Sequence, residues 1–217
     1  MTEKWLAPRG LIFDLDGTLV DSFGDIAAAL NDTRAQYGLP ALTLAQVRAE
    51  VGSGSEYLVR RLVPGPPAEQ AAALTFYLAR YEERALQQTR PFPGVLEVLE
   101  HFADRPLAVV TNKTQRLTRC ILEGLGWWER FRIVLGGDAL ERCKPDPLPV
   151  QQVLQCFALA PQEVVLIGDG LHDLHAGQAA GVRTVAVTTG VESRASLEAH
   201  GADHVIDRMD ALLALCD

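Results

Sequence analysis

Short apolar runs rich in β-branched residues recur along the chain and alternate with longer amphipathic segments. The runs occupy residues 10–13, 107–110, 132–135, 164–167 and 183–187, with a weaker run at 204–206. Helix-type patterns between them occupy residues 94–102, 115–125, 149–157 and 174–180. Continuous apolar runs that alternate with amphipathic helices are typical of βαβ units around a buried parallel sheet. The pattern therefore predicts an α/β core, a Rossmann-like parallel sheet with helices on both faces.

The stretch from about residue 23 to residue 88 interrupts this alternation. It contains no β-branched run but several helix signals, separated by a Pro-Gly-Pro-Pro break at residues 64–67. The positions at helical spacing are Ile26, Leu30, Thr33 and Tyr37 before Gly38, and Leu74, Leu78, Tyr81 and Ala85 further on. Thr43 is a candidate N-cap for a helix over residues 44–51. We therefore predict an all-helical insert over residues 22–88, flanked by two parts of the core at residues 1–21 and 89–217.

Composition narrows the classes of partner. The chain has 217 residues, of which 48% are hydrophobic, and a net charge of −8. An acidic protein lacks the basic surface that nucleic-acid binding requires. Residues 1–10 lack the apolar centre of a signal peptide, and no run approaches the roughly 18 apolar residues of a membrane helix. We expect a cytoplasmic monomer or homodimer with no nucleic-acid or membrane partner.

Two carboxylates follow the first apolar run, in the string FDLDGTL at residues 13–19. In an extended segment the side chains of Asp14 and Asp16 point the same way, because strand periodicity is two. Like charges at that spacing repel unless a cation or a shared proton relieves them. Gly17 permits a sharp turn and a close backbone approach to a ligand. In open α/β folds the ends of parallel strands carry the functional site, so this string indicates chemistry rather than a simple turn.

The string FDLDGTL resembles the nucleophile motif of the haloacid dehalogenase superfamily, whose phosphatases carry Asp-x-Asp-Gly-Thr-Leu/Val. Three further segments resemble the later motifs of that superfamily, in the same order. They are LAVVTNK at residues 107–113, KPDP at residues 144–147 and VVLIGDGLHD at residues 164–173. The resemblance spans nearly the whole chain. It implies that the helical insert is a C1 cap, which closes over the site and excludes water.

The resemblance also implies a role for each acidic residue. The residue that matches Asp14 attacks phosphorus and forms an aspartyl-phosphate. The residue that matches Asp16 protonates the leaving oxygen and then activates water. A Mg²⁺ ion would be held by Asp14, the backbone carbonyl of Asp16, and Asp169, with Asp173 supporting a metal-bound water. Such a site of carboxylates, a carbonyl and water suits Mg²⁺.

Three further residues are expected to hold the phosphate. Thr111 and Asn112 end the second strand, where a hydroxyl and backbone N–H groups can contact phosphate oxygens. Lys144 would neutralise phosphate charge and order the two carboxylates. The resemblance implies catalytic as well as binding roles for Thr111 and Lys144.

The fourth motif departs from the superfamily pattern at one position. Gly170 stands where many members have Ser or Thr, and loss of that hydroxyl would loosen the support of the metal site without changing the ligand Asp169. His172 and His175 flank Asp173 without a matching metal-binding partner. We expect them at the surface or in the surroundings of the site.

The cap should select the substrate. Residues 51–56, VGSGSE, followed by Arg60 and Arg61, resemble the cap loop of phosphoglycolate phosphatases. Residues Gly52, Ser53 and Gly54 could offer N–H groups to a small carboxylate, with the arginines adding charge. The expected partner is a small phosphorylated metabolite, 2-phosphoglycolate first.

Other activities share parts of this pattern. Sugar-phosphate phosphatases and pyrophosphatases of the superfamily have the same architecture, and a phosphosugar mutase shares every core motif and differs in its cap. A haloacid dehalogenase needs neither Asp16 nor magnesium. A receiver domain that accepts phosphate on an aspartate needs neither Asp16 nor a helical insert. The residues therefore favour a phosphatase.

Overall fold

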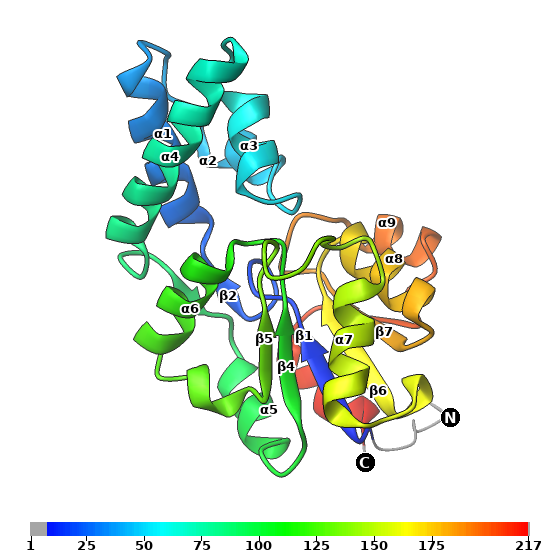
Figure 1. Cartoon of the computed structure of the whole chain (residues 1–217). Helices are drawn as coiled ribbons and strands as arrows, with labels where there is room; N and C mark the ends of the chain where they lie inside the picture. Colours follow the sequence, from blue (N-terminus) through cyan, green and yellow to red (C-terminus); the bar gives the residue numbers. More distant parts are fainter. Residues whose placement is uncertain (1–7, 217) are drawn as a thin grey trace.

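A six-stranded parallel sheet forms the centre of the computed structural model, which describes residues 8–216. Its strands are β1 (Gly10–Phe13), β4 (Leu107–Val110), β5 (Ile133–Leu135), β6 (Val164–Gly168), β7 (Arg183–Val187) and β8 (His204–Ile206). Their spatial order is β5-β4-β1-β6-β7-β8 (Figure 1). The chain adds β4 and β5 on one side of β1 and then β6, β7 and β8 on the other side. This reversal places a topological switch point between β1 and β6. The predicted α/β fold with a parallel sheet is confirmed.

Helices cover both faces of the sheet, because the strand side chains that point to either face are apolar. Leu11 and Phe13 of β1 pack in one cluster with residues of α5 (Val95–His101), α6 (Gln115–Gly124) and α10 (Leu212–Leu215). Ile12, between them, packs in the opposite cluster with residues of α7 (Leu148–Phe157) and α8 (Leu171–Ala180). Figure 1 shows α7 lying across that second face. The remaining core helices are α9 (Arg194–Ala199) and the 3₁₀ turns η1 (Trp128–Arg130), η2 (Pro161–Glu163) and η3 (Met209–Ala211).

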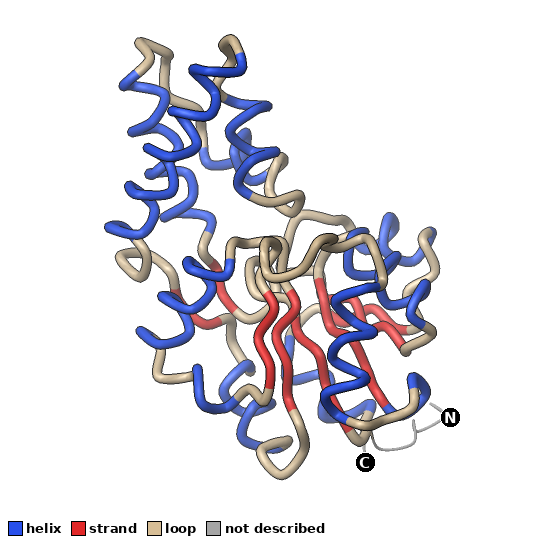
Figure 2. The backbone as a smooth tube through the Cα atoms, in the orientation of Figure 1, coloured by secondary structure: helices blue, strands red, loops and turns tan. Residues whose placement is uncertain are grey.

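Four helices between the first two sheet strands form a separate layer above the sheet (Figures 1 and 2). They are α1 (Phe23–Gln36), α2 (Leu44–Arg48), α3 (Ser55–Leu62) and α4 (Pro67–Arg84). They share their own buried apolar cluster, to which every one of the four contributes. The Thr43 side chain accepts a hydrogen bond from the Gln46 backbone N–H, so Thr43 is the N-cap of α2 as predicted. We call this four-helix layer the cap and the sheet with its helices the core.

Three details of the cap differ from the sequence prediction. Helix α2 ends at Arg48, so residues 49–51 are not helical. The α3 helix was not predicted. On α4 Tyr81 is buried as predicted. The predicted Leu74 and Leu78 are partly buried and pack against the cap cluster, whereas the neighbouring Ala73 and Tyr77 are fully buried.

Two chain connections join the cap to the core, and they run side by side. The β2 strand (Val20–Asp21) pairs antiparallel with the β3 strand (Arg90–Pro91), a two-stranded ladder that the sequence did not indicate. The buried Asp25 carboxylate accepts hydrogen bonds from the backbone N–H groups of Gln88 and Thr89 and from the Thr89 hydroxyl. These contacts tie the start of the first cap helix to the connection that returns to the core.

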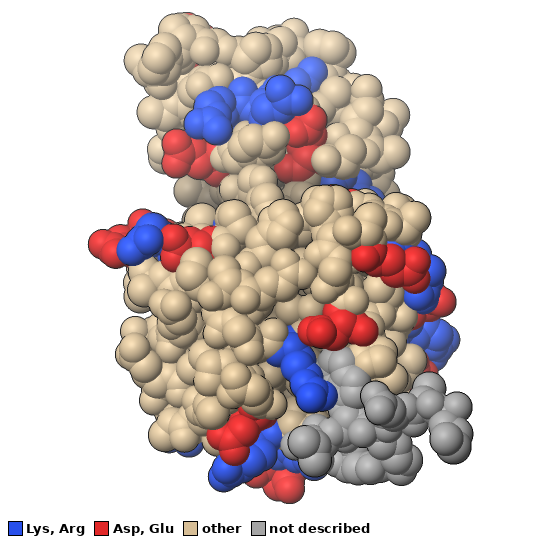
Figure 3. Space-filling model, turned by 90° about the vertical axis from the view of Figure 1, so that its right-hand side faces the viewer, with Lys and Arg blue, Asp and Glu red and all other residues tan. Residues whose placement is uncertain are grey.

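The cap and the core appear as two lobes in the space-filling view of Figure 3. Acidic and basic side chains are interspersed on the face drawn there. Among residues 8–216 no helix combines the length and apolar character needed to cross a membrane. Residues 1–7, which belong to the predicted first part of the core and to the segment without a signal-peptide pattern, lie outside the described residues.

Candidate active site

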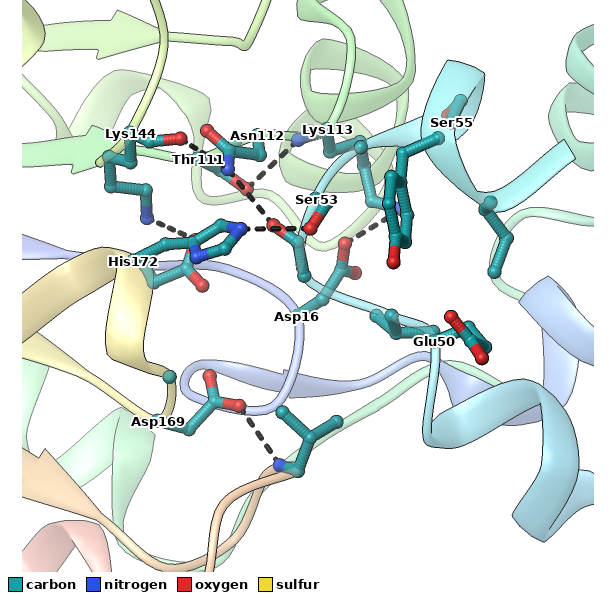
Figure 4. A pocket seen from close by; sticks show the side chains of 18 of the residues that line it. Asp16, Glu50, Ser53, Ser55, Thr111, Asn112, Lys113, Lys144, Asp169 and His172 are labelled. Atoms are coloured by element: carbon teal, nitrogen blue, oxygen red, sulfur yellow. Dashed lines mark hydrogen bonds and ion pairs between the residues drawn. The ribbon is translucent and has the colours of Figure 1, made fainter. Parts of the chain in front are cut away.

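The site is a cavity of about 360 Å³ between the carboxyl ends of the central strands and the cap. The core contributes polar residues from the segments that follow β1, β4 and β6, and the cap contributes residues 49–55 with Tyr57 and Tyr77. Figure 4 shows Asp16, Thr111 and Asp169 of the core and Glu50, Ser53 and Ser55 of the cap around the same space. The site therefore lies where an open α/β sheet with a switch point between β1 and β6 is expected to bind its ligand.

Three carboxylates converge at the core side of this cavity. One oxygen from each of Asp14, Asp169 and Asp173 lies within 4.8 Å of the others. Burial, reinforced by Asp14 and Asp173, raises the pKa of Asp169 well above its ordinary value. Burial also raises the pKa of Asp173 to about 6, although the Lys144 ammonium opposes it. Such a group of oxygen donors can bind a hard divalent cation.

Lys144 is the cation that faces this cluster. Its Nζ donates to the Val110 carbonyl at 2.6 Å and pairs with Asp173 at 2.5 Å and with Asp14 at 3.0 Å. Burial alone would lower the pKa of Lys144, but the Asp14 and Asp173 carboxylates outweigh it and raise the pKa above its ordinary value. Lys144 is therefore charged and holds two of the three carboxylates.

The second carboxylate of the β1 loop has a separate environment. Asp16 Oδ1 accepts a hydrogen bond from the Ser22 hydroxyl at 2.5 Å, and Asp16 Oδ2 pairs with Lys113 Nζ at 2.9 Å. Lys113 Nζ also donates to the hydroxyl of Tyr81 on α4, at 2.6 Å. Asp14 and Asp16 are thus neighbours in sequence that contact different lysines. Sequence reasoning assigned no role to Ser22, Lys113 or Tyr81.

Gly17 fits closely into the site. Its φ is +84°, and a Cβ atom there would lie 2.5 Å from Asp169 Oδ2, so the position requires glycine. The Thr18 hydroxyl donates to Asp169 Oδ1 at 2.8 Å, and the Thr189 hydroxyl donates to the Gly17 carbonyl at 2.6 Å. The turn after β1 is therefore anchored to Asp169 and to the loop after β7.

Thr111 and Asn112 both line the cavity, but their side chains have different surroundings. The buried Thr111 hydroxyl accepts a hydrogen bond from the Lys113 backbone N–H at 3.3 Å. The Asn112 amide donates to the Gly52 carbonyl of the cap and to the Lys144 carbonyl, each at 2.9 Å. The Asn112 side chain thus connects three segments of the site.

The cap loop faces the core across the cavity. Gly52, Ser53 and Gly54 line it, and Ser53 Oγ lies 2.8 Å from His172 Nε2, within hydrogen-bond distance. Burial and the Lys144 charge lower the pKa of His172. Gly54 has a φ of +86°, and a Cβ there would lie 2.9 Å from the Asn112 carbonyl. His172 is therefore part of the contact between cap and core.

Arg60 and Arg61, predicted to bind the substrate, lie away from the cavity lining in the structure. Both residues are exposed and neither lines the cavity. The Arg61 guanidinium is hydrogen-bonded to Glu50, and the Arg60 guanidinium lies over the Tyr57 ring. Both residues lie on α3, a helix that the sequence did not predict, near its C-terminal end. Among the described residues that line the cavity, Lys113 and Lys144 are the only lysines or arginines.

Gly170 and His175 complete the predicted fourth motif. The Gly170 backbone N–H donates to Asp173 Oδ2 at 3.1 Å, so the backbone itself orients Asp173. A Cβ at Gly170 would lie 3.6 Å from that oxygen, an ordinary contact, so a side chain would fit there. His175 does not line the cavity, and its ring packs against His200.

The fold and the placement of the carboxylates define an α/β protein with an acidic site under a helical cap. The chain belongs to the haloacid dehalogenase-like hydrolase family, whose model matches residues 11–187. It is 37% identical over 190 residues to the phosphoglycolate phosphatase of Thiobacillus denitrificans, a match that covers 84% of each chain. It is 34% identical over 226 residues to the N-acetylmuramic acid 6-phosphate phosphatase of Pseudomonas aeruginosa, covering 99% of each chain.

A solved structure extends the likeness to three dimensions. The crystal structure of a predicted phosphoglycolate phosphatase from Haemophilus somnus 129pt superposes with a TM-score of 0.90 at 29% identity. The match covers 95% of this chain and 97% of that one, so it includes cap and core together. The protein is therefore an enzyme of the haloacid dehalogenase-like hydrolase family, and its relatives include named phosphatases.

Proposed function

We propose that the protein is a Mg²⁺-dependent phosphatase that hydrolyses 2-phosphoglycolate to glycolate and phosphate through an aspartyl-phosphate on Asp14. The observation that carries this proposal is the separation of the two carboxylates after β1. Asp14 lies with Lys144 and the acidic cluster, whereas Asp16 is held by Ser22 and Lys113. The two carboxyl groups thus have separate partners, as the separate roles of a nucleophile and a general acid require.

The chemistry has two steps. An Asp14 oxygen attacks phosphorus while the bond from phosphorus to the ester oxygen breaks, and protonated Asp16 gives its proton to that departing oxygen. A water oxygen then attacks phosphorus, the bond from phosphorus to Asp14 breaks, and the Asp16 carboxylate takes a proton from that water. Phosphate leaves, and both aspartates return to their starting forms.

The residues present fit a magnesium ion. Asp14, Asp169 and Asp173 bring three oxygen donors together, while only one lysine faces them. Asp14 Oδ1 is buried and lies 3.0 Å from the Lys144 ammonium without a hydrogen bond of good geometry, so it keeps the capacity to act as a ligand. By resemblance to the superfamily, the Asp16 carbonyl would join Asp14 and Asp169, and Asp173 would act through a water. When bound, the ion would neutralise carboxylate and phosphate charge.

Thr111 and Lys144 are proposed to hold the phosphate. Both line the cavity beside Asp14, and the Lys144 ammonium is already within 3.0 Å of the nucleophile. A cation there offsets the repulsion between a carboxylate nucleophile and a phosphate dianion, a form of electrostatic stabilisation that also acts in the transition state.

The substrate proposal rests on the size of the cavity, the cap loop and the relatives. A volume of about 360 Å³ is at the small end of the roughly 300–1,000 Å³ of ligand pockets. The cap side offers the Gly52–Ser55 segment and the start of α3, whose first backbone N–H groups can receive a carboxylate. Arg60 and Arg61 have no part in this proposal.

A second candidate substrate is N-acetylmuramic acid 6-phosphate. The observation that favours it is the relative with that name, because the match covers 99% of each chain. This ester needs the same core chemistry and differs in what the cap must accommodate. It therefore belongs in the same experiment.

A substrate panel with added Mg²⁺ tests the proposal. We expect kcat/KM to be highest for 2-phosphoglycolate, lower for N-acetylmuramic acid 6-phosphate and hexose 6-phosphates, and lowest for pyrophosphate. Chelation by EDTA should remove the activity and Mg²⁺ should restore it. A higher kcat/KM for either sugar phosphate would reject 2-phosphoglycolate as the substrate, and full activity after chelation would reject the metal-dependent mechanism.

A further inference from the structure

Lys113 is a buried cation to which the proposed chemistry gives no role. It follows β4, and only 3% of its side-chain surface is exposed. An ammonium group in such a place must find partners, because burying an unpaired charge is strongly unfavourable. Its partners are Asp16 Oδ2 at 2.9 Å and the Tyr81 hydroxyl at 2.6 Å, and its Nζ lies 4.1 Å from the centre of the Tyr81 ring.

The contacts of Lys113 leave Asp16 little freedom to rotate. Ser22 holds one oxygen of the Asp16 carboxyl and Lys113 holds the other. The two anchors approach from different parts of the chain, one at the start of the cap and one at the end of β4. The plane of the carboxyl is therefore fixed, and its orientation relative to a bound ester is fixed with it.

Tyr81 fixes Lys113 in turn. The Tyr81 side chain belongs to α4 of the cap and is 1% exposed, packed beside Tyr77 with ring centres 5.8 Å apart. Helix α4 packs extensively on α1, so Tyr81 belongs to the packed interior of the cap. The contact from Tyr81 through Lys113 to Asp16 runs from the cap to the core without a break.

We propose that Lys113 is a positioning residue for Asp16, held in place by Tyr81 of the cap, and that it sets the efficiency with which Asp16 protonates the leaving group. The inference rests on the acid–base role of Asp16 in the proposed function. Lys144, which contacts Asp14 and Asp173, serves the phosphate side of the cavity. Lys113 instead contacts Asp16, the residue proposed to protonate the departing ester oxygen.

This role has a kinetic signature. An alkoxide is a poor leaving group and must receive a proton as its bond to phosphorus breaks. A nitrophenolate leaves readily without one. The value of kcat/KM reports the first phosphoryl transfer, in which the ester oxygen departs, whereas kcat also contains the later hydrolysis of the aspartyl-phosphate. A residue that positions the general acid therefore affects kcat/KM for alkyl phosphates much more than for aryl phosphates. A residue that merely supports the fold or binds phosphate affects both alike.

The experiment measures kcat and KM of Lys113→Met and Tyr81→Phe with 2-phosphoglycolate, ethyl phosphate and p-nitrophenyl phosphate. For Lys113→Met we expect kcat/KM to fall about 10–100-fold on both alkyl esters and by less than about threefold on the aryl ester. Tyr81→Phe removes one hydroxyl from the cap and should shift the same ratio by a smaller factor. Because it keeps the ring, this second variant tests the idea if Lys113→Met does not fold.

Two further variants serve as references. Asp16→Asn should show the same preference for the aryl ester, more strongly. Arg116→Met removes a cation that also pairs with α4, through Glu82, but is largely exposed. Arg116→Met should leave kcat and KM unchanged for all three substrates.

The outcomes separate the possibilities. An equal loss on alkyl and aryl esters would overturn the proposal. So would an increase in KM confined to 2-phosphoglycolate, because Lys113 would then bind the substrate carboxylate. If the wild type hydrolyses neither alkyl ester, or Asp16→Asn shows no aryl preference, the proposed function has failed and the role of Lys113 fails with it.

Discussion

At the residue scale, the clustered carboxylates of Asp14, Asp169 and Asp173 face one lysine, Lys144, which contacts two of them. This excess of negative charge makes the site unfavourable without a bound cation. Asp169 is the extreme case, because within residues 8–216 no lysine or arginine pairs with it while Asp14 and Asp173 lie close. Its partners are the Thr18 hydroxyl and the Val191 backbone N–H. These neutral donors offset only part of the repulsion and burial that raise its pKa. The arrangement favours function over stability, as is common at active sites.

We therefore predict that Asp169→Asn stabilises the metal-free protein while it abolishes activity. The pKa of Asp169 in the folded state lies above its ordinary value of 3.8. The native state therefore loses stability as the pH rises from 3.8 through the pKa of the folded state. An amide of the same shape removes this loss. The melting temperature should rise at pH 7 by about 2–4 °C for each kcal/mol gained, and the gain should vanish below about pH 4, where both states are protonated.

Thermal melts of metal-free wild type, Asp169→Asn and Asp104→Asn check this prediction. Asp104 is exposed, so its substitution is the matched control. Added Mg²⁺ should raise the melting temperature of the wild type and not that of Asp169→Asn. A lower melting temperature for Asp169→Asn in metal-free buffer would contradict the account.

The residues of the core motifs could be found in the sequence because each follows a buried strand. Asp14, Thr111 and Asp169 stand at strand ends, and the parallel sheet brings those ends to one edge. Lys113 was harder to assign, since its partner Asp16 is 97 positions away and Tyr81 lies in another lobe. The signal available was its place two residues beyond Thr111, after a strand that neighbours β1.

At the scale of elements, the sheet was predictable and the cap only partly so. Strands such as β1, β4 and β6 are buried on both faces and read as continuous apolar runs. Cap helices are short and half exposed, so their bounds depend on tertiary contacts. Helix α3 begins after Gly54, which has a positive φ, and the sequence Gly-Ser-Gly-Ser gave no periodic signal there.

The contacts of Asp25 with Gln88 and Thr89 join the two chain connections, and we call this place the hinge between cap and core. It gives a prediction at the scale of elements. Asp25→Ala would leave the backbone donors of Gln88 and Thr89, and the Thr89 hydroxyl, without their acceptor. Leaving a buried donor without an acceptor lowers the free energy of unfolding by about 1–3 kcal/mol. We expect the free energy of unfolding in urea to fall by about 2–5 kcal/mol, because more than one donor is affected.

Asp32→Ala is the matched control, since Asp32 also lies on α1 and pairs with Arg84 and Arg80 of α4. That pair is partly exposed and should contribute less than about 1 kcal/mol. Equal losses for the two variants would show that the Asp25 contacts have no special place in the hinge.

At the scale of the whole molecule, the cap sits on the core through specific polar contacts around the cavity. They are Arg48 with the Thr189 and Gly190 carbonyls, Asn112 with the Gly52 carbonyl, Ser53 with His172, and Tyr81 with Lys113. None could be derived from sequence spacing, because they depend on how the lobes are oriented. The same orientation leaves Arg60 and Arg61 outside the cavity.

The central claim is that phosphate passes through a covalent bond to Asp14. Rapid acid quenching of the enzyme during turnover of 2-phosphoglycolate with Mg²⁺, followed by mass spectrometry of its peptides, tests it most directly. We predict one phosphoryl group on Asp14 in the wild type, an accumulation of that species in Asp16→Asn with an aryl phosphate, and none in Asp14→Asn, which should be inactive. Phosphorylation of another residue, or steady turnover by Asp14→Asn, would contradict the account.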